Sequence, residues 1–242
     1  MTLTAGATAD VYGPEGAAAY HDLATRDTSE IRDICRAVRA TSGPVLELAA
    51  GSGRLTLPLL ALRRPVTALD LSADLLQLLA ERLGELPRSL REACTTVHAD
   101  MTSFRLPDRF GAVVLGTTSV SLLDPALRPS LYRSVAAHLA PAGRLLLTTR
   151  TATADDDLRE RLTGASGRGY LLTETRVRPG VRRVVLLPDG AAHALVSEVH
   201  EVPADTLAAE LAAHGFEITA RTVTDEGPGW NTTLIQAEVS GR

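Results

Sequence analysis

The 242-residue chain contains no lysine, because all 25 of its basic residues are arginines. Chemistry that needs a lysine amine, such as Schiff-base catalysis or a phosphate-loop lysine, is therefore excluded. Cysteine is nearly absent as well. Cys35 and Cys94 lie far apart and have no partners at a metal-binding spacing. We therefore expect two buried thiols in a reducing compartment, without a disulfide and without a metal site.

Long apolar runs are missing as well, and we expect no targeting leader. Residues 1–10 contain no basic stretch followed by an apolar one, and no run approaches the length of a membrane span. We therefore expect a cytoplasmic protein with no membrane partner. The formal charge of −4 argues against nucleic acid as a partner, because such binding depends on basic side chains that neutralise phosphates. The sequence does not indicate an oligomeric state.

The remaining composition is that of one globular α/β domain, with 45% hydrophobic and 22% charged residues. We divide the chain into four parts. An N-terminal helical cap or lid (1–42) precedes a ligand-binding core (43–150), an antiparallel β insertion (151–202) and a final segment (203–242) that supplies the last helix and two strands of the core sheet.

Apolar periodicity predicts the elements of the cap and core. The cap contains helices Gly13–Ala24 and Ser29–Ala40, the second with Thr28 or Ser29 as its N-cap. In the core, short apolar strands alternate with amphipathic helices, which predicts a doubly wound, Rossmann-like parallel sheet. The strands are Val45–Ala49, Val66–Leu69, Thr95–His98, Ala112–Leu115 and Arg144–Thr149, and the helices are Gly53–Ala61, Ala73–Leu83 and Leu127–Leu139.

Beyond residue 150 the apolar pattern changes to a period of two. A polar, glycine-rich link leads into three predicted antiparallel strands separated by turn sequences at 178–180 and 188–190. The strands are Tyr170–Val177, Val181–Leu187 and Ala192–Val199. Helix Ala204–Ala213 and strands Phe216–Val223 and Thr232–Val239 then complete a sheet of seven strands.

The most informative stretch runs from Val45 to Leu55, a strand that passes through a glycine turn directly into a helix. Gly51 and Gly53 allow a ligand to approach the backbone, and the helix offers unpaired amides to a polar group. A dinucleotide-binding loop has a third glycine, where Thr56 stands, and lacks an acid such as Glu47 within the strand. An NAD-dependent oxidoreductase is therefore disfavoured.

Two acids follow at the ends of the next strands. Asp70 is placed to accept hydrogen bonds from vicinal ribose hydroxyls, and Asp100 is followed by Met101. Together these motifs resemble the class I S-adenosylmethionine-dependent methyltransferases, whose first motif is an acid, a small residue, Gly, any residue and Gly. Ala49 replaces the first glycine commonly found there.

That resemblance implies S-adenosylmethionine as the cofactor and assigns a role to each motif. Glu47 would hold the cofactor's amino group through neighbours or water, and the turn Ala49–Gly53 with Arg54 would surround its methionine and ribose. Leu71 would pack on the adenine, which the Asp100 carboxylate and the Met101 amide would read. Gly116, Thr117 and Thr118 would face the sulfonium.

A second resemblance covers most of the chain. Segments at 10–12, 16–23, 43–59, 109–124 and 166–172 are similar to actinobacterial N-methyltransferases of peptide natural products, including those of glycopeptide antibiotics and daptide-type ribosomal peptides. This resemblance implies that Tyr12 and Tyr20 close over the cofactor. It also implies that the acceptor is an α-amine of a peptide or peptide-like compound, methylated once or twice.

The acceptor side is less defined by sequence. His21, beside Tyr20, is the first candidate base, and the candidate acceptor contacts are Thr118, Ser121, Trp230 and Asn231. We expect the insertion to hold a peptide along a strand edge, with Glu174, Glu198 or Glu201 attracting a cationic amino terminus. A small-molecule O- or N-methyltransferase and a non-catalytic cofactor-binding module remain as alternatives.

Overall fold

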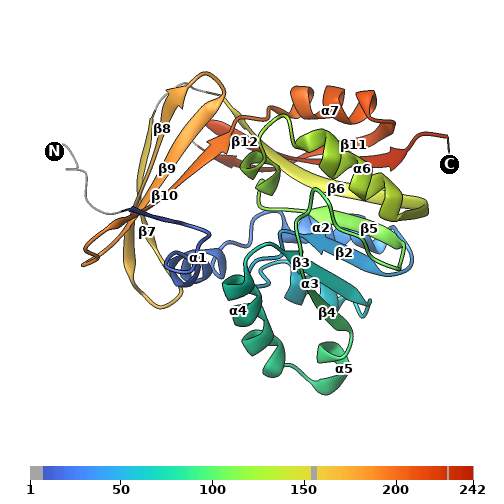
Figure 1. The fold of residues 1–242 in the computed structure, drawn as a ribbon, viewed down its shortest axis with the longest axis horizontal. Helices are drawn as coiled ribbons and strands as arrows, with labels where there is room; N and C mark the ends of the chain where they lie inside the picture. The colour runs from blue at the N-terminus through green and yellow to red at the C-terminus, as the bar shows by residue number, and fades with distance from the viewer. Residues whose placement is uncertain (1–7, 154–156, 228, 242) are drawn as a thin grey trace.

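The computed structural model describes residues 8–153, 157–227 and 229–241, which form a core sheet and a small sheet (Figure 1). The core sheet has seven strands, as predicted. In spatial order they are β11 (Phe216–Gly227), β12 (Trp230–Val239), β6 (Leu139–Ala152), β5 (Phe110–Leu115), β2 (Val45–Leu48), β3 (Val66–Asp70) and β4 (Cys94–His98).

The predicted doubly wound arrangement is confirmed. Neighbouring strands from β6 to β4 are parallel, whereas β12 runs antiparallel to both β6 and β11. Apolar side chains on both faces bury the sheet between two helical layers. One layer contains α6 (Arg128–His138) and α7 (Ala204–Ala213), and the other contains α2 (Ile31–Arg39), α3 (Thr56–Ala61) and α4 (Ala73–Gly84), with the short α5 (Arg88–Arg91) after it.

The small sheet is larger than the predicted insertion. Its spatial order is β1 (Thr8–Asp10), β10 (Ala194–His200), β9 (Val181–Pro188), β8 (Gly169–Arg178) and β7 (Leu158–Thr163). The two predicted hairpin turns are present, with Gly180 and Gly190 at φ 73° and 74°. Two strands were not predicted from the sequence: β7, which lies in the predicted polar link, and β1, which pairs in parallel with β10. The N-terminal segment is thus partly a strand.

The helical part of the cap packs against the small sheet. Helix α1 (Ala17–Ala24) and Val11 bury apolar side chains against Tyr170, Leu186 and Leu195. In Figure 1, α1 accordingly lies between the small sheet and α4. None of the helices that the structure describes is both long and apolar enough to cross a membrane.

Three predicted helix starts are wrong, each by a few residues. The first cap helix begins at Ala17 and not at Gly13, and the core helix begins at Thr56 because Gly53 has φ 88°, which is not helical. The second cap helix begins at Ile31. Its N-cap residue is Glu30, in a left-handed conformation with φ 58°, and neither Thr28 nor Ser29. The side chain of Glu30 is engaged elsewhere, as described below.

Candidate active site

One cavity of about 1300 Å³ opens at the carboxyl ends of β2, β3 and β4. Most pockets for a single small ligand measure about 300–1000 Å³. The cavity is therefore larger than one small ligand needs. Many of the predicted cofactor residues line it together, namely Tyr12, Tyr20, Ala49, Gly51, Asp70, Leu71, Asp100 and Met101.

Asp70, the last residue of β3, lines the cavity and also forms a hydrogen bond with the glycine turn. Its Oδ2 accepts the Gly51 N–H and its Oδ1 accepts the Ser72 N–H, both at 2.7 Å. Burial raises the pKa of Asp70, while these backbone bonds act in the opposite direction. Each carboxylate oxygen has a second lone pair. Asp70 can therefore hold the turn and still accept hydroxyl groups from a ligand.

Two further features of the cavity lining near Asp70 suit a nucleoside. Leu71 is an apolar side chain with 68% of its surface exposed in the cavity, which leaves a surface for a flat ring. A Cβ on Gly51 would lie 3.4 Å from the Tyr20 ring, so the absence of a side chain on Gly51 keeps the space between this turn and Tyr20 open. Beyond Leu71, Asp100 accepts the N–H and the hydroxyl of Thr102 through Oδ1.

Tyr12 and Tyr20 form one side of the cavity. Their ring centroids lie 5.3 Å apart, and the planes meet at 60°, which is an edge-to-face contact. Burial raises the pKa of Tyr20 to about 12, so its phenol is a neutral hydrogen-bond donor at physiological pH. The aromatic pair therefore offers a ligand π-faces and hydroxyl groups without adding charge.

The other predicted site residues do not contribute to the cavity lining as the described residues define it. His21 places Nδ1 2.8 Å from the Ser52 hydroxyl, and burial lowers its pKa. Its role as a base stays a prediction without geometric support. Trp230 lies in β12 with the Arg150 guanidinium 5.6 Å from its ring centre. The remaining residues outside the lining are Glu47, Gly53, Arg54, Gly116, Thr117, Thr118, Ser121 and Asn231.

Glu47 lies beneath the glycine turn in β2. It is buried, and its Oε2 accepts a hydrogen bond from the Thr56 hydroxyl at 2.6 Å. Burial raises the pKa of Glu47 to about 8, against the opposing effects of Thr56 and Arg54. The carboxyl group is therefore largely neutral at pH 7. In this geometry it supports the turn from below.

This raised pKa predicts a pH-dependent stability. Between its ordinary pKa of 4.5 and about 8, the unfolded chain releases the Glu47 proton while the folded protein keeps it. The free energy of unfolding should therefore fall as pH rises through this window, by at most about 1.4 kcal/mol per pH unit from this group. Urea unfolding of wild type and Glu47→Gln from pH 5 to 9 measures the difference. The slope should flatten in Glu47→Gln but not in Glu92→Gln, whose carboxylate is exposed; equal slopes in wild type and Glu47→Gln would contradict the assignment.

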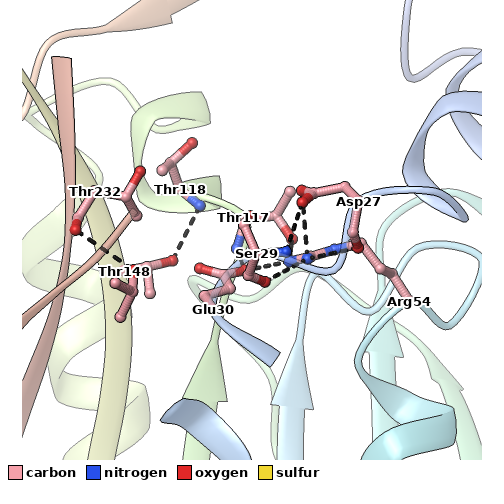
Figure 2. Close-up of polar contacts among 9 residues, drawn as sticks. Asp27, Ser29, Glu30, Arg54, Thr117, Thr118, Thr148 and Thr232 are labelled. Atoms are coloured by element: carbon pink, nitrogen blue, oxygen red, sulfur yellow. Dashed lines mark hydrogen bonds and ion pairs between the residues drawn. The ribbon is translucent and has the colours of Figure 1, made fainter. Parts of the chain in front are cut away.

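A polar cluster around the buried Glu30 and Arg54, shown in Figure 2, connects the cap to the core and consists of Asp27, Ser29, Glu30, Arg54 and Thr117. The Arg54 guanidinium contacts the Glu30 carboxylate, donates to the Thr117 hydroxyl at 2.6 Å and donates to the backbone oxygens of Asp27 and Ser29. Glu30 Oε1 also accepts the Thr117 N–H at 2.6 Å. We call these residues the Glu30 cluster. An acid just before a helix was the only sequence signal for Glu30, and it does not indicate these partners.

The backbone around the Glu30 cluster is strained. Glu30, Thr117 and Thr118 have φ values of 58°, 55° and 54°, in the left-handed region. A left-handed residue other than glycine costs about 1–3 kcal/mol, and such residues concentrate at functional sites where neighbouring contacts hold them. Here the neighbouring contacts come from the cap, the glycine turn and β6, where the Thr148 hydroxyl accepts the Thr118 N–H at 3.2 Å.

The far side of the cavity is formed by the small sheet, in which Glu198 was the one lining residue named as a candidate from the sequence. Alternate residues of β9 and β10 face it, with Val185 paired across the strands to Val196 and Arg183 paired to Glu198. The short helix η1 (Ser119–Leu122) lies nearby and contributes Ser119 and Leu122. The far side is thus an apolar strip that ends in an ion pair.

The expected attraction of a cationic amino terminus to insertion carboxylates needs correction. Glu198 is ion-paired with Arg178 and Arg183, at 2.8 and 3.0 Å. Glu174 is buried against Arg150 and Arg182, and Glu201 contacts Arg176. Their charges are therefore already compensated. Across the described residues, no group of three or more His, Cys, Asp or Glu side chains is arranged to hold a metal ion.

Comparison with known proteins agrees with this geometry. The methyltransferase domain family matches residues 45–143, the part that contains the glycine turn, Asp70 and Asp100. The chain is 33% identical over 102 residues to the rRNA adenine N-6-methyltransferase of Corynebacterium diphtheriae, a match that spans 42% of this chain and 38% of that protein. This relative is thus covered over less than half of its length.

Solved structures match over nearly the full chain. The glycopeptide N-methyltransferase MtfA, complexed with sinefungin, is 33% identical, with 98% of this chain and 93% of that chain covered and a TM-score of 0.70. CalS10 from Micromonospora echinaspora, an amino pentose methyltransferase involved in calicheamicin biosynthesis, is 25% identical, with coverages of 96% and 99% and a TM-score of 0.68. The chain therefore belongs to the S-adenosylmethionine-dependent methyltransferases.

Proposed function

We propose that this protein N-methylates the amine of a peptide-like or other small natural-product acceptor, with S-adenosylmethionine as the methyl donor. The observation that carries the proposal is the single cavity that joins the carboxyl edge of the core sheet to one face of the small sheet. A transferase needs two ligands side by side with water excluded between them. One cavity with a nucleoside side and an apolar second side meets that requirement.

The residues of the first side fit S-adenosylmethionine, which supplies an electrophilic methyl group on a sulfonium. Asp70 is positioned to accept the ribose hydroxyls, Leu71 to cover the adenine, and Asp100 with Met101 to read its edge. Among the described lining residues, Glu198 is paired with Arg183, and the carboxylates of Asp10, Asp70, Asp74 and Asp100 have no further arginine beside them in the lining. This acidic lining favours a cationic ligand.

The second side suits an acceptor on the face of the small sheet and not along its edge. The edge of β10 is already occupied by β1, whose residues Thr8–Asp10 pair with Ala194–Val196. Strand addition at that edge is therefore blocked. The strip of Val185, Leu187 and Val196 instead offers an apolar floor next to the cofactor side. An acceptor with an apolar body and an amine directed at the cofactor side matches it.

The assignment to nitrogen rests on the relatives and on charge. MtfA is a glycopeptide N-methyltransferase and CalS10 an amino pentose methyltransferase, so both similar structures belong to enzymes of amine-bearing natural products. The acidic cavity would concentrate an ammonium acceptor from solution. Only the neutral amine attacks, and a free α-amine has a pKa of about 7.7–8.0. The methylation rate should therefore rise with pH through this range.

A pair of peptides tests the acceptor assignment. We expect mass spectrometry to detect a gain of one or two methyl groups on an apolar peptide with a free amino terminus, and none on its N-acetylated twin. An amino sugar serves as the second acceptor, because of the similarity to CalS10. Methylation of the acetylated twin at the same rate would contradict N-methylation of an α-amine. Transfer to the amino sugar alone would assign a small-molecule acceptor, and cofactor binding without any transfer would favour a non-catalytic module.

A further inference from the structure

We propose that Glu30 is a positioning residue, which holds the loop Gly116–Ser119 in the shape that receives the amino-acid end of the cofactor. This inference rests on the proposed function only for the identity of the cofactor. It does not depend on the acceptor. Glu30 is distant in sequence from Arg54 and Thr117, which it contacts in the core, and it does not line the cavity.

Strand order places the loop at that end of the ligand. Asp70 and Asp100 follow β3 and β4, so the nucleoside lies over this half of the sheet edge. On the other side of the glycine turn, β2 is paired with β5. A ligand with its ribose at Asp70 therefore extends past Gly51 toward the loop that follows β5. Ser119 of that loop lines the cavity, and Thr117 and Thr118 immediately precede it in the chain.

The shape of this loop requires external support. Thr117 and Thr118 are consecutive β-branched residues in the left-handed region, which their side chains disfavour. Three hydrogen bonds hold them, in which Glu30 accepts the Thr117 N–H, Arg54 donates to the Thr117 hydroxyl and Thr148 accepts the Thr118 N–H. In Figure 2 these three partners belong to three separate segments of the chain. If one bond is lost, the loop is free to relax to an ordinary conformation.

Glu30 is the central member of this set. Its Oε1 receives both the Thr117 N–H and the Arg54 guanidinium, and its side chain is 2% exposed. Within the described residues, Glu30 Oε2 and Arg54 Nε are buried without a hydrogen-bond partner. Buried polar groups left unpaired are costly and uncommon. The Glu30–Arg54 ion pair leaves polar atoms buried and unpaired, and this cost fits a role in shaping the site better than a role in stability.

Binding measurements with two cofactor fragments test the inference without an acceptor. The probes are S-adenosylhomocysteine, which has the amino-acid end, and 5′-methylthioadenosine, which lacks it. In Glu30→Leu, which removes the acceptor of the Thr117 N–H, we expect calorimetry to show S-adenosylhomocysteine bound at least tenfold more weakly and methylthioadenosine within twofold of wild type. Adding Thr118→Gly should recover at least threefold of the loss, because glycine adopts a left-handed conformation without strain. The control Glu238→Gln removes a carboxylate from a remote ion pair with Arg144 and should change neither affinity.

Several outcomes would overturn the inference. Unchanged binding of S-adenosylhomocysteine to folded Glu30→Leu would do so, and so would equal weakening of both ligands, which indicates a general loss of structure. If Glu30→Leu does not fold, Thr148→Val provides the same comparison by removing the acceptor of the Thr118 N–H, with at least a threefold selective loss expected. A wild-type protein that binds neither ligand would overturn the cofactor assignment and this inference together. Failure of peptide methylation alone would leave the inference standing.

Discussion

Replacing Asp70 with alanine is expected to weaken S-adenosylmethionine binding by about 1.5–3 kcal/mol, or roughly 10- to 150-fold. The change removes the carboxylate that we place at the ribose hydroxyls, where charge-assisted hydrogen bonds are the strong ones. It also removes the acceptor of the Gly51 N–H and so loosens the turn around the ligand. Isothermal titration calorimetry measures the loss directly.

Two companion variants separate these effects. Asp70→Asn keeps an oxygen for the backbone amides but removes the charge, so its loss should lie between wild type and alanine. Asp74→Ala removes an exposed carboxylate from the same cavity and should change affinity by less than about 0.5 kcal/mol. An Asp70→Ala protein that is folded and binds as tightly as wild type would exclude Asp70 from the cofactor site.

The largest effect on stability is expected from Arg54→Ala, which should lower the free energy of unfolding by about 3–5 kcal/mol. The substitution leaves the Glu30 carboxylate buried without its cation and removes the donor to Thr117. Urea unfolding measures the change. Arg144→Ala breaks an ion pair with partners 31% and 34% exposed and should cost no more than about 1 kcal/mol.

A double replacement tests the physical cause. If the penalty arises from an uncompensated buried charge, Arg54→Met combined with Glu30→Met should be more stable than Arg54→Ala alone, because neither charge then remains. Equal losses in Arg54→Ala and Arg144→Ala would show that burial of the pair contributes nothing. The double variant is a stability test only, since it also removes the groups that hold the loop after β5.

The nucleoside side of the site was predictable because its signals are local. The glycine turn, Asp70 and Asp100 each follow an apolar strand directly, and the carboxyl ends of adjacent parallel strands meet at one edge. The strands of the core were predictable for a related reason, because runs such as Val113–Leu115 are apolar on both faces. In both cases the residues that carry the signal are neighbours in sequence.

The acceptor side and the Glu30 cluster depend on pairings that sequence does not display. Thr8–Asp10 has no strand periodicity of its own and becomes a strand only through β10. Leu158–Thr163 is mostly charged or polar and resembles a loop, although β8 pairs with it along its length. Glu30 contacts Arg54 and Thr117, 24 and 87 positions away. Its left-handed backbone is imposed by those contacts, so no local propensity predicts it.

The pairing of β1 with β10 also bears on how the protein forms during synthesis. Thr8–Asp10 leaves the ribosome long before its partner Ala194–Val196 is made. Closing so long a loop costs chain entropy, and contacts this distant in sequence form late. The nucleoside side of the cavity, built from residues 45–101, has all its strands much earlier. A nascent chain therefore acquires the means to hold a cofactor well before it acquires a closed wall for an acceptor.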